Sequence, residues 1–295
     1  MTTKFQTPWE RTAGARFAAS DGSPPSFVYS PQDSLWGEPE IIGFGNDAFA
    51  VKEMDRVKAC EIVRANHYSK TVYSASRFHL GVYAPHLLGV LQFGAAMNPA
   101  SQASVVAETA QDEYLELNRM WLDDSLPRNS ESKAIAYAMA YIKRKDSRIQ
   151  WVQSFADERC GRQGVVYQAA NFIYCGEHTS TFWEYDGKVY HNSILTDGRQ
   201  AETPSGRLLR EKRAELIPHK LRQFRYLYFI KRAARKRLLL KQMPYPKHAS
   251  EGSMESRPVT NGKGAGQFRH DAPISPDAKA ENDAGERQPA ENQKP

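Results

Sequence analysis

The chain has 295 residues, and 40% of them are hydrophobic, which is enough for a packed core in one or two domains. Its three cysteines, Cys60, Cys160 and Cys175, form no Cys-x-x-Cys pair, which excludes a disulfide-rich secreted protein. No apolar run approaches the roughly 20 residues that cross a bilayer, and residues 1–10 lack the apolar core of a signal peptide. We therefore expect a cytoplasmic protein without a membrane segment.

The positive charge is concentrated in one part of the chain. The net charge is +6, but residues 207–241 alone hold thirteen Lys and Arg against two Asp and Glu. Residues 248–295 hold six basic and eight acidic residues. A basic segment of this kind is typical of nucleic-acid binding and argues against a small-molecule substrate.

The first 40 residues are rich in Ser, Pro and Gly, and they predict an extended arm. Apolar spacing then predicts a helix over 52–66, followed by the polar cluster 66–70. Residues 78–83 and 87–93 predict two strands that are joined by a short turn. A polar loop follows over 98–111.

Residues 114–172 predict a strand, a turn, a helix, a second strand and a second helix. The strands are 114–122 and 151–156, and they should be parallel because a helix crosses between them. Ligands of such sheets bind at the carboxyl ends of the strands, where the turn 123–128 and Asp157 both fall.

The turn that precedes the first of these helices has the chemistry of a phosphate site. A helix amino terminus presents unpaired N–H groups and the positive end of a dipole. Arg128 adds a guanidinium, Asn129 an amide, and Ser130 and Ser132 add hydroxyls. The alternative is that Asn129 or Ser130 only caps the helix and that Arg128 is solvated.

The remaining chain predicts strands over 172–176, 182–185 and 188–195, with Asp186-Gly187 as a hairpin turn. Residues 207–215 and 221–240 are interpreted as helices, the second strongly basic. From residue 244 onward the composition predicts disorder. The expected class is α+β: a single domain over 41–205 with a mixed, mostly antiparallel sheet flanked by helices, a basic helical segment over 206–243 and a disordered tail over 244–295.

The order of these elements resembles the acyl-CoA-dependent N-acetyltransferases, although the turn at 125–130 has no glycine. A closer resemblance covers roughly residues 52–195 and rests on five strings. They are Asn66-His67-Tyr68-Ser69-Lys70, Leu117-Asn118-Arg119-Met120-Trp121, Leu126-Pro127-Arg128-Asn129-Ser130-Glu131-Ser132, Ser154-Phe155-Ala156-Asp157 and Val166-Tyr167-Gln168-Ala169-Ala170-Asn171-Phe172. In this order they resemble the Mom DNA-modification proteins of Mu-like phages.

This resemblance implies an enzyme that converts adenine in DNA to its N6-carbamoylmethyl (methylcarbamoyl) form and so blocks host restriction. It implies an acyl-CoA-type donor, acetyl-CoA or a relative, and Fe2+. The implied catalytic residues are His67, Tyr68, Arg119, Asp157 and Tyr167. The expected metal ligands are His67 and Asp157, and Tyr83 is a candidate for the base pocket.

Each of these residues also has a structural explanation. His67 suits a helix carboxyl terminus, Asp157 suits a helix cap, and Tyr167 suits the buried face of a helix. Arg119 lies in an apolar strand, where it either pairs with Glu116 or Asp157 or holds an anion in a cleft.

Double-stranded DNA and the acyl-CoA donor are the expected partners, and we also consider a homodimer. Four basic residues are expected to contact DNA: Lys231, Arg232, Arg235 and Lys236. Two other functions stay open, namely a DNA-binding protein without catalysis and an N-acetyltransferase that acts on another substrate. A cleft with Arg119, Asp157 and Tyr167 favours an enzyme, because binding alone does not need it.

Overall fold

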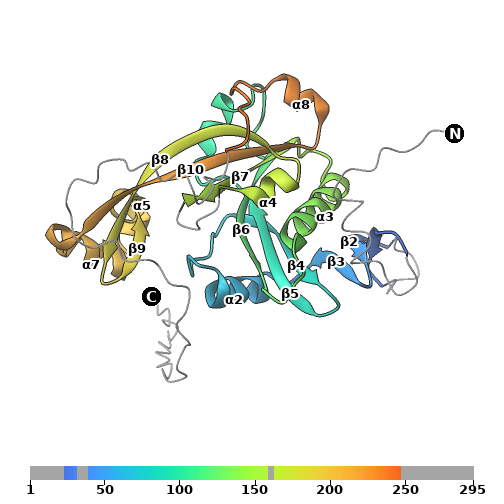
Figure 1. The fold of residues 1–295 in the computed structure, drawn as a ribbon, viewed down its shortest axis with the longest axis horizontal. Helices are drawn as coiled ribbons and strands as arrows, with labels where there is room; N and C mark the ends of the chain where they lie inside the picture. The colour runs from blue at the N-terminus through green and yellow to red at the C-terminus, as the bar shows by residue number, and fades with distance from the viewer. Residues whose placement is uncertain (1–22, 32–38, 159–162, 247–295) are drawn as a thin grey trace, which may run out of the picture. The chain divides into compact units, whose positions relative to one another are not determined.

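The computed structural model describes residues 23–31, 39–158 and 163–246, and within them all strands belong to one mixed sheet (Figure 1). The strand order is β1-β2-β3-β4-β5-β6-β7-β10-β8-β9. The strands are β1 (Ser26–Tyr29), β2 (Ile41–Asn46), β3 (Phe49–Glu53), β4 (Ser76–Tyr83), β5 (Leu87–Gly94), β6 (Tyr114–Leu122), β7 (Trp151–Asp157), β8 (Ile173–Tyr185), β9 (Lys188–His191) and β10 (Ile217–Phe229). The helices are α2 (Arg56–Asn66), α3 (Ser130–Lys145), α4 (Val165–Ala169), α5 (Ser193–Thr196), α6 (Gly198–Ala201), α7 (Pro204–Glu211) and α8 (Arg232–Lys236), with the short turns η1 (Pro99–Ser104) and η3 (Arg213–Glu215).

The predicted α+β class is confirmed. Every described strand pair is antiparallel except β6 with β7, which is parallel as the crossover helix α3 requires. The expected order of helix, antiparallel strands, turn, helix, strand, helix and hairpin is present from α2 to β9.

The two faces of the sheet have separate cores. The larger core packs α3 and α4 against one face, which we call the α3 face. Leu91 belongs to it, whereas its neighbour Val90 packs against α2 on the opposite face, the α2 face. This alternation follows from the two-residue period of a strand, and it assigns the other side chains of β6, β7 and β10 to a face.

The parallel strands β6 and β7 part soon after they begin. Only residues 114–116 of β6 pair with residues 151–153 of β7. Beyond them β6 continues along β5 to Leu122, and β7 continues along β10 to Asp157. The sheet therefore opens between β6 and β7 toward their carboxyl ends. The turn over residues 123–129 that precedes α3, which we call the α3 turn, lies at the same end.

The basic helix that we predicted over 221–240 is wrong for most of its length. Residues 217–229 form β10, which inserts between β7 and β8, and only Arg232–Lys236 is helical. The aromatic side chains explain the difference, because Phe224 and Tyr226 alternate with Arg225 and point into the core of the α3 face. The predicted helix over 207–215 corresponds to α7 and η3.

The amino-terminal arm is in part a strand. β1 pairs with β2, and the Phe27 ring packs edge-on against Phe44 at 5.3 Å between centroids. The strands predicted over 172–176 and 182–185 are one strand, β8, and its hairpin to β9 turns at Asp186 and Gly187, both with positive φ. The predicted disorder of the tail falls outside the described residues beyond Pro246, as do residues 1–22 of the arm.

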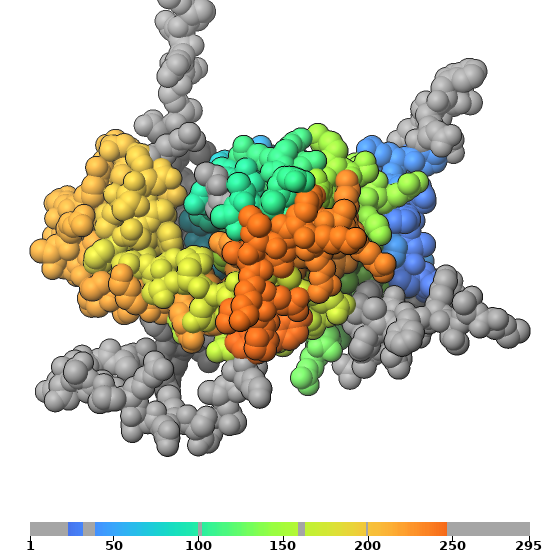
Figure 2. Space-filling model, turned by 90° about the horizontal axis from the view of Figure 1, so that it is seen from above, coloured from blue at the N-terminus to red at the C-terminus, as the bar shows by residue number. Residues whose placement is uncertain are grey.

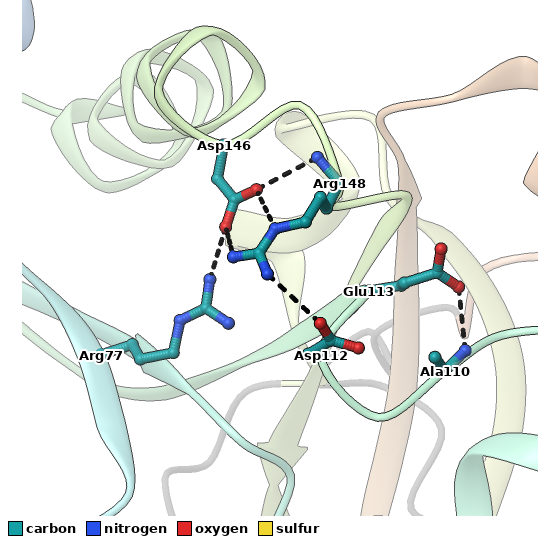
Figure 3. A network of polar contacts seen from close by, with 6 residues as sticks. All are labelled: Arg77, Ala110, Asp112, Glu113, Asp146 and Arg148. Carbon is teal, nitrogen blue, oxygen red and sulfur yellow. Dashed lines mark hydrogen bonds and ion pairs between the residues drawn. The ribbon is translucent and has the colours of Figure 1, made fainter.

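The segment after β10 packs near the amino ends of β6 and β7. Arg237 donates to the carbonyl of Ala107 at 3.0 Å, and Leu238 pairs with Val106. Figure 2 shows this orange segment against the blue-green surface of the loop between β5 and β6, which contains Val106. A polar network at the same end joins α3 to β4, in which Asp146 accepts from Arg77 at 2.7 Å and from Arg148 at 2.9 Å (Figure 3). This end of the sheet is stabilised by ion pairs that the site does not need.

Candidate active site

The loop after α2 contains a hydrogen-bond chain that ends on His67. Arg119 of β6 donates from Nη2 to the Thr71 hydroxyl at 3.2 Å, and that hydroxyl donates to Ser69 Oγ at 3.1 Å. Ser69 Oγ lies 2.8 Å from His67 Nδ1. We call this series the Arg119–His67 chain. Arg119 also donates from Nε to the Thr71 carbonyl at 2.8 Å, so the guanidinium holds the loop as well.

The Arg119–His67 chain fixes the proton on the imidazole. The backbone N–H of Ser69 donates to His67 Nδ1 at 3.1 Å, so Nδ1 is an acceptor and the neutral ring has its proton on Nε2. His67 is buried at the end of α2, and its ring centroid lies 4.3 Å from that of Tyr68, a residue that is 53% exposed, with the two rings tilted by 33°. This tautomer places the ring N–H on Nε2, beside the exposed Tyr68 ring.

Asp157 lies on the same face as Arg119. Phe155 lies between Ser154 and Ala156, of which Ala156 belongs to the core of the α3 face, so Phe155 and Asp157 face α2. Arg119 is opposite Gln92, whose amide contacts Cys60 of α2 at 3.7 Å. His67, Tyr68, Arg119 and Asp157 are therefore on the α2 face, on both sides of the opening between β6 and β7.

Tyr167 and the α3 turn lie on the opposite face. The Tyr167 ring is buried and packs at 5.3 Å against Tyr226 and at 5.6 Å against Phe172. This is the packing of a core aromatic side chain, as the structural explanation of Tyr167 expects. Tyr167 therefore lies on the opposite face of the sheet from Arg119 and Asp157.

The amino terminus of α3 has no side-chain cap. Asn129 has a positive φ of 72°, and its side chain does not accept from the helix. Ser130 and Ser132 donate their hydroxyls back to the carbonyls of Pro127 and Asn129, at 2.5 and 3.0 Å. The N–H of Ser130 donates to the Pro127 carbonyl at 3.1 Å, so the N–H groups of Glu131 and Ser132 are the ones that could meet an anion, and Arg128 is exposed beside them.

The other predicted substrate residues are not next to this group. Tyr83 ends β4, where Lys52 lies 5.5 Å above its ring and burial raises the pKa of the phenol. Lys231, Arg232, Arg235 and Lys236 are exposed on and beside α8. Since Ile230 and Lys231 both donate to the carbonyl of Gln150, α8 follows the amino end of β7, about 20 Å along the strand from Asp157.

The predicted metal site does not fit the donors that are present. In the described parts of the chain, no three His, Cys, Asp or Glu side chains lie close enough to hold a metal ion. A bond from His67 to a metal would also require the imidazole proton to move, because Nδ1 already accepts from Ser69. We therefore assign no step to iron.

Two buried residues of this region were not predicted as site residues. Glu116 is 6% exposed on the α2 face and accepts from Gln153 at 2.8 Å, and burial raises the pKa of its carboxyl. Ser154 Oγ is buried and has no hydrogen-bond partner among the described residues. Polar residues at 116, 118 and 119 in an otherwise apolar strand were the sequence signal for Glu116.

Comparison with known proteins assigns the family. The family model described as the Mom protein family matches residues 48–247, which include every element of the site. The chain belongs to the Mom family. It is 47% identical over 218 residues to the methylcarbamoylase Mom of Escherichia phage Mu, which covers 71% of this chain and 88% of the phage Mu protein.

Solved structures with similar folds are acetyltransferases. A ribosomal-protein-S5-alanine acetyltransferase from Vibrio fischeri has a TM-score of 0.39 at 8% identity and covers 65% of this chain and 98% of its own. NAA60 of Arabidopsis thaliana in complex with acetyl-CoA has a TM-score of 0.36 at 9% identity, with 61% and 99% covered.

Membership of the Mom family confirms the predicted resemblance and the prediction of a DNA-modifying enzyme of the transferase class. The Mom match extends to residue 247, so it includes β10 and α8, which lie outside the predicted catalytic domain over 41–205. No helix of the described residues is long and apolar enough to cross a membrane.

Proposed function

We propose that this protein converts adenine in phage DNA to its N6-carbamoylmethyl form, uses an acyl-CoA-type donor and so protects the DNA from host restriction. The main support is the Mom family match over residues 48–247, together with the name of the phage Mu relative. The geometry agrees with a transferase, because His67, Arg119 and Asp157 flank the opening in the sheet. DNA binding without catalysis gives no reason for a hydrogen-bond chain that fixes the His67 proton.

The donor is proposed to bind across the opening between β6 and β7. Its phosphates would meet the N–H groups at the start of α3, with Arg128, Asn129, Ser130 and Ser132 around them. The buried Ser154 hydroxyl, which lacks a partner in the described chain, is on the α3 face of β7 and suits a polar group of such a ligand. When bound, the donor would supply the two-carbon unit of the carbamoylmethyl group; an acyl thioester contains no amide nitrogen, so that nitrogen must come from a second reactant.

The protein side of the reaction is proposed to lie on the α2 face. His67 donates from Nε2 to an oxygen or nitrogen of the bound reactants, and Arg119 holds the loop that positions it. Asp157 is the candidate base for the adenine amine, and Tyr167 and Tyr83 remain candidates for the leaving group and the base pocket. Such an enzyme must take adenine out of the base stack, and the exposed Tyr68 ring offers a surface on which a base can stack.

The first prediction tests the modification itself. Bacteria that express this chain should contain an adenine nucleoside heavier than deoxyadenosine in their DNA, and that DNA should resist some restriction enzymes. Mass spectrometry of digested DNA measures the mass difference, and cells with the Asp157→Asn variant serve as the control. Unaltered nucleosides from cells that contain folded wild-type protein would contradict the proposed activity.

The second prediction tests the donor site. Arg128→Ala should weaken the binding of acetyl-CoA about tenfold, because an exposed charge-assisted contact to phosphate is lost. Calorimetry with the protein alone measures this affinity. Arg144→Ala, which removes an exposed arginine from the last turn of the same helix, should leave it unchanged. Loss of DNA affinity with intact acetyl-CoA affinity would assign the turn to the DNA instead.

Lys231, Arg232, Arg235 and Lys236 are proposed to contact the DNA backbone away from the modified base. All four are exposed, and their distance along β7 from Asp157 is close to the width of a duplex. They therefore contribute to affinity and salt dependence rather than to chemistry.

A further inference from the structure

Arg225 is the arginine of β10 that faces the site. It lies between Phe224 and Tyr226, which pack into the core of the α3 face, so its own side chain is on the α2 face. The guanidinium carbon lies 5.2 Å from the centroid of Phe155, the residue opposite it on β7. The His178 ring meets Phe155 edge-on at 5.5 Å. Arg225, Phe155 and His178 form what we call the Arg225 cluster.

The Arg225 guanidinium has no acceptor within the described residues. No hydrogen bond or ion pair of its five N–H groups occurs among residues 23–31, 39–158 and 163–246. Arg222, three residues earlier on the same strand, differs in this respect, because it donates to Glu158 at 2.9 and 2.7 Å and lies 3.5 Å from Glu177. Arg222 thus has carboxylate partners, whereas Arg225, which faces the site, has no acceptor within the described residues.

The surroundings of Arg225 make a charged guanidinium without an acceptor unfavourable unless a ligand supplies the acceptor. Arg225 is half-buried, and burial lowers the pKa of its guanidinium and of the neighbouring His178 imidazole. The Glu116 carboxylate acts on Arg225 through its field, but its hydrogen bonds are with Gln153, the Met97 backbone and Asn118. A partly desolvated cation with unused donors is stabilised by a bound anion.

The position of Arg225 selects the anion. Gln223, two residues along β10, is opposite Asp157, so Arg225 and Asp157 lie on the same face and on adjacent strands. The donor phosphates have their own site at the α3 turn, on the other face. A base that leaves the stack brings its own phosphodiester close to the protein, and a guanidinium matches a phosphate in a bidentate manner.

We propose that Arg225 binds the phosphodiester next to the adenine that is modified, with Phe155 and His178 fixing the guanidinium. This inference rests on the proposed DNA-modifying function and adds a residue that binds the target nucleotide. Phe155 limits the guanidinium to one side of its ring by a cation–π contact. The Arg225 cluster therefore binds the backbone locally, whereas α8 binds it at a distance.

The test compares Arg225→Gln with Arg222→Gln, which removes the same charge from the same strand. Arg225→Gln should raise the KM for a short duplex about tenfold and reduce the log–log salt slope of binding by about 0.9, the value for one phosphate. Arg222→Gln should change the KM and the salt slope less than Arg225→Gln does. Arg225→Lys should bind the duplex more tightly than Arg225→Gln, because it keeps the positive charge. Acetyl-CoA affinity, measured without DNA, should stay at the wild-type value in all three.

A duplex with methylphosphonates beside the modified adenine identifies the phosphate. Methylphosphonate at one of these positions should weaken binding of the duplex to wild type. The same substitution should not weaken binding to Arg225→Gln any further, because that variant already lacks the contact. Equal losses in both proteins at every position, or a loss of acetyl-CoA affinity in Arg225→Gln, would overturn the inference. Absence of modified adenine with wild-type protein would instead refute the proposed function, since the binding measurements do not depend on turnover.

Discussion

Arg119→Gln should lower the rate of adenine modification roughly a hundredfold without unfolding the protein. The guanidinium donates to the carbonyl and the hydroxyl of Thr71, and hydrogen bonds to charged groups contribute about 1.5–3 kcal/mol each. Their loss frees the loop that holds His67, and about 3 kcal/mol corresponds to roughly a hundredfold in rate. Single-turnover modification of a duplex measures the effect, and the thermal midpoint verifies folding.

A double-mutant cycle shows whether Arg119 acts through the Arg119–His67 chain. Thr71→Val removes the hydroxyl that connects Arg119 to Ser69 but keeps the carbonyl acceptor. If Arg119 positions His67, the double variant should be little slower than Arg119→Gln alone. Fully additive losses would show that Arg119 binds the reactants directly. Arg77→Gln, which breaks an ion pair with Asp146 at the other end of the sheet, should keep the wild-type rate (Figure 3).

Local patterns were sufficient to predict the central elements. The strand, turn, helix and strand from residue 114 to 157 appear as predicted, because each has a clear period and a turn or cap signal at its end. β10 was missed because Lys220, Arg222 and Arg225 hide the alternation of its aromatic residues. A strand that inserts between two earlier strands is defined by tertiary pairing, which a local pattern does not contain.

The contacts of the candidate site that could be predicted from the sequence are those between residues close together along the chain. His67, Ser69 and Thr71 lie in one loop, so the string 66–70 already indicated a polar cluster. Arg119 joins them from β6, and Arg225 meets Phe155 only because β10 inserts beside β7. Such contacts depend on strand order, and for that reason the sequence indicated Arg119 through a motif and did not indicate Arg225.

Lys133→Met should change the pH dependence of stability more than any other single loss of charge on α3. Lys133 is 4% exposed in the first turn of this helix, and burial lowers the pKa of its amine to about 7. The positive end of the helix dipole also disfavours the cation. The rings of Phe49 and Tyr137, at 4.6 and 5.2 Å from Nζ, act in the opposite direction and favour it.

The sign of the effect follows from proton binding. Between a folded-state pKa near 7 and the ordinary value of 10.5, the unfolded chain binds more protons than the folded protein. The free energy of unfolding therefore rises with pH across this window. Between pH 6.5 and 9 the free energy of unfolding of wild type should rise by about 1–3 kcal/mol more than that of Lys133→Met. Each kcal/mol corresponds to roughly 2–4 °C in the midpoint of thermal unfolding. Lys143→Met, which removes an exposed amine from the same helix, should keep the wild-type pH dependence. Parallel curves for wild type and Lys133→Met would show that the cation–π contacts hold Lys133 charged over the whole range.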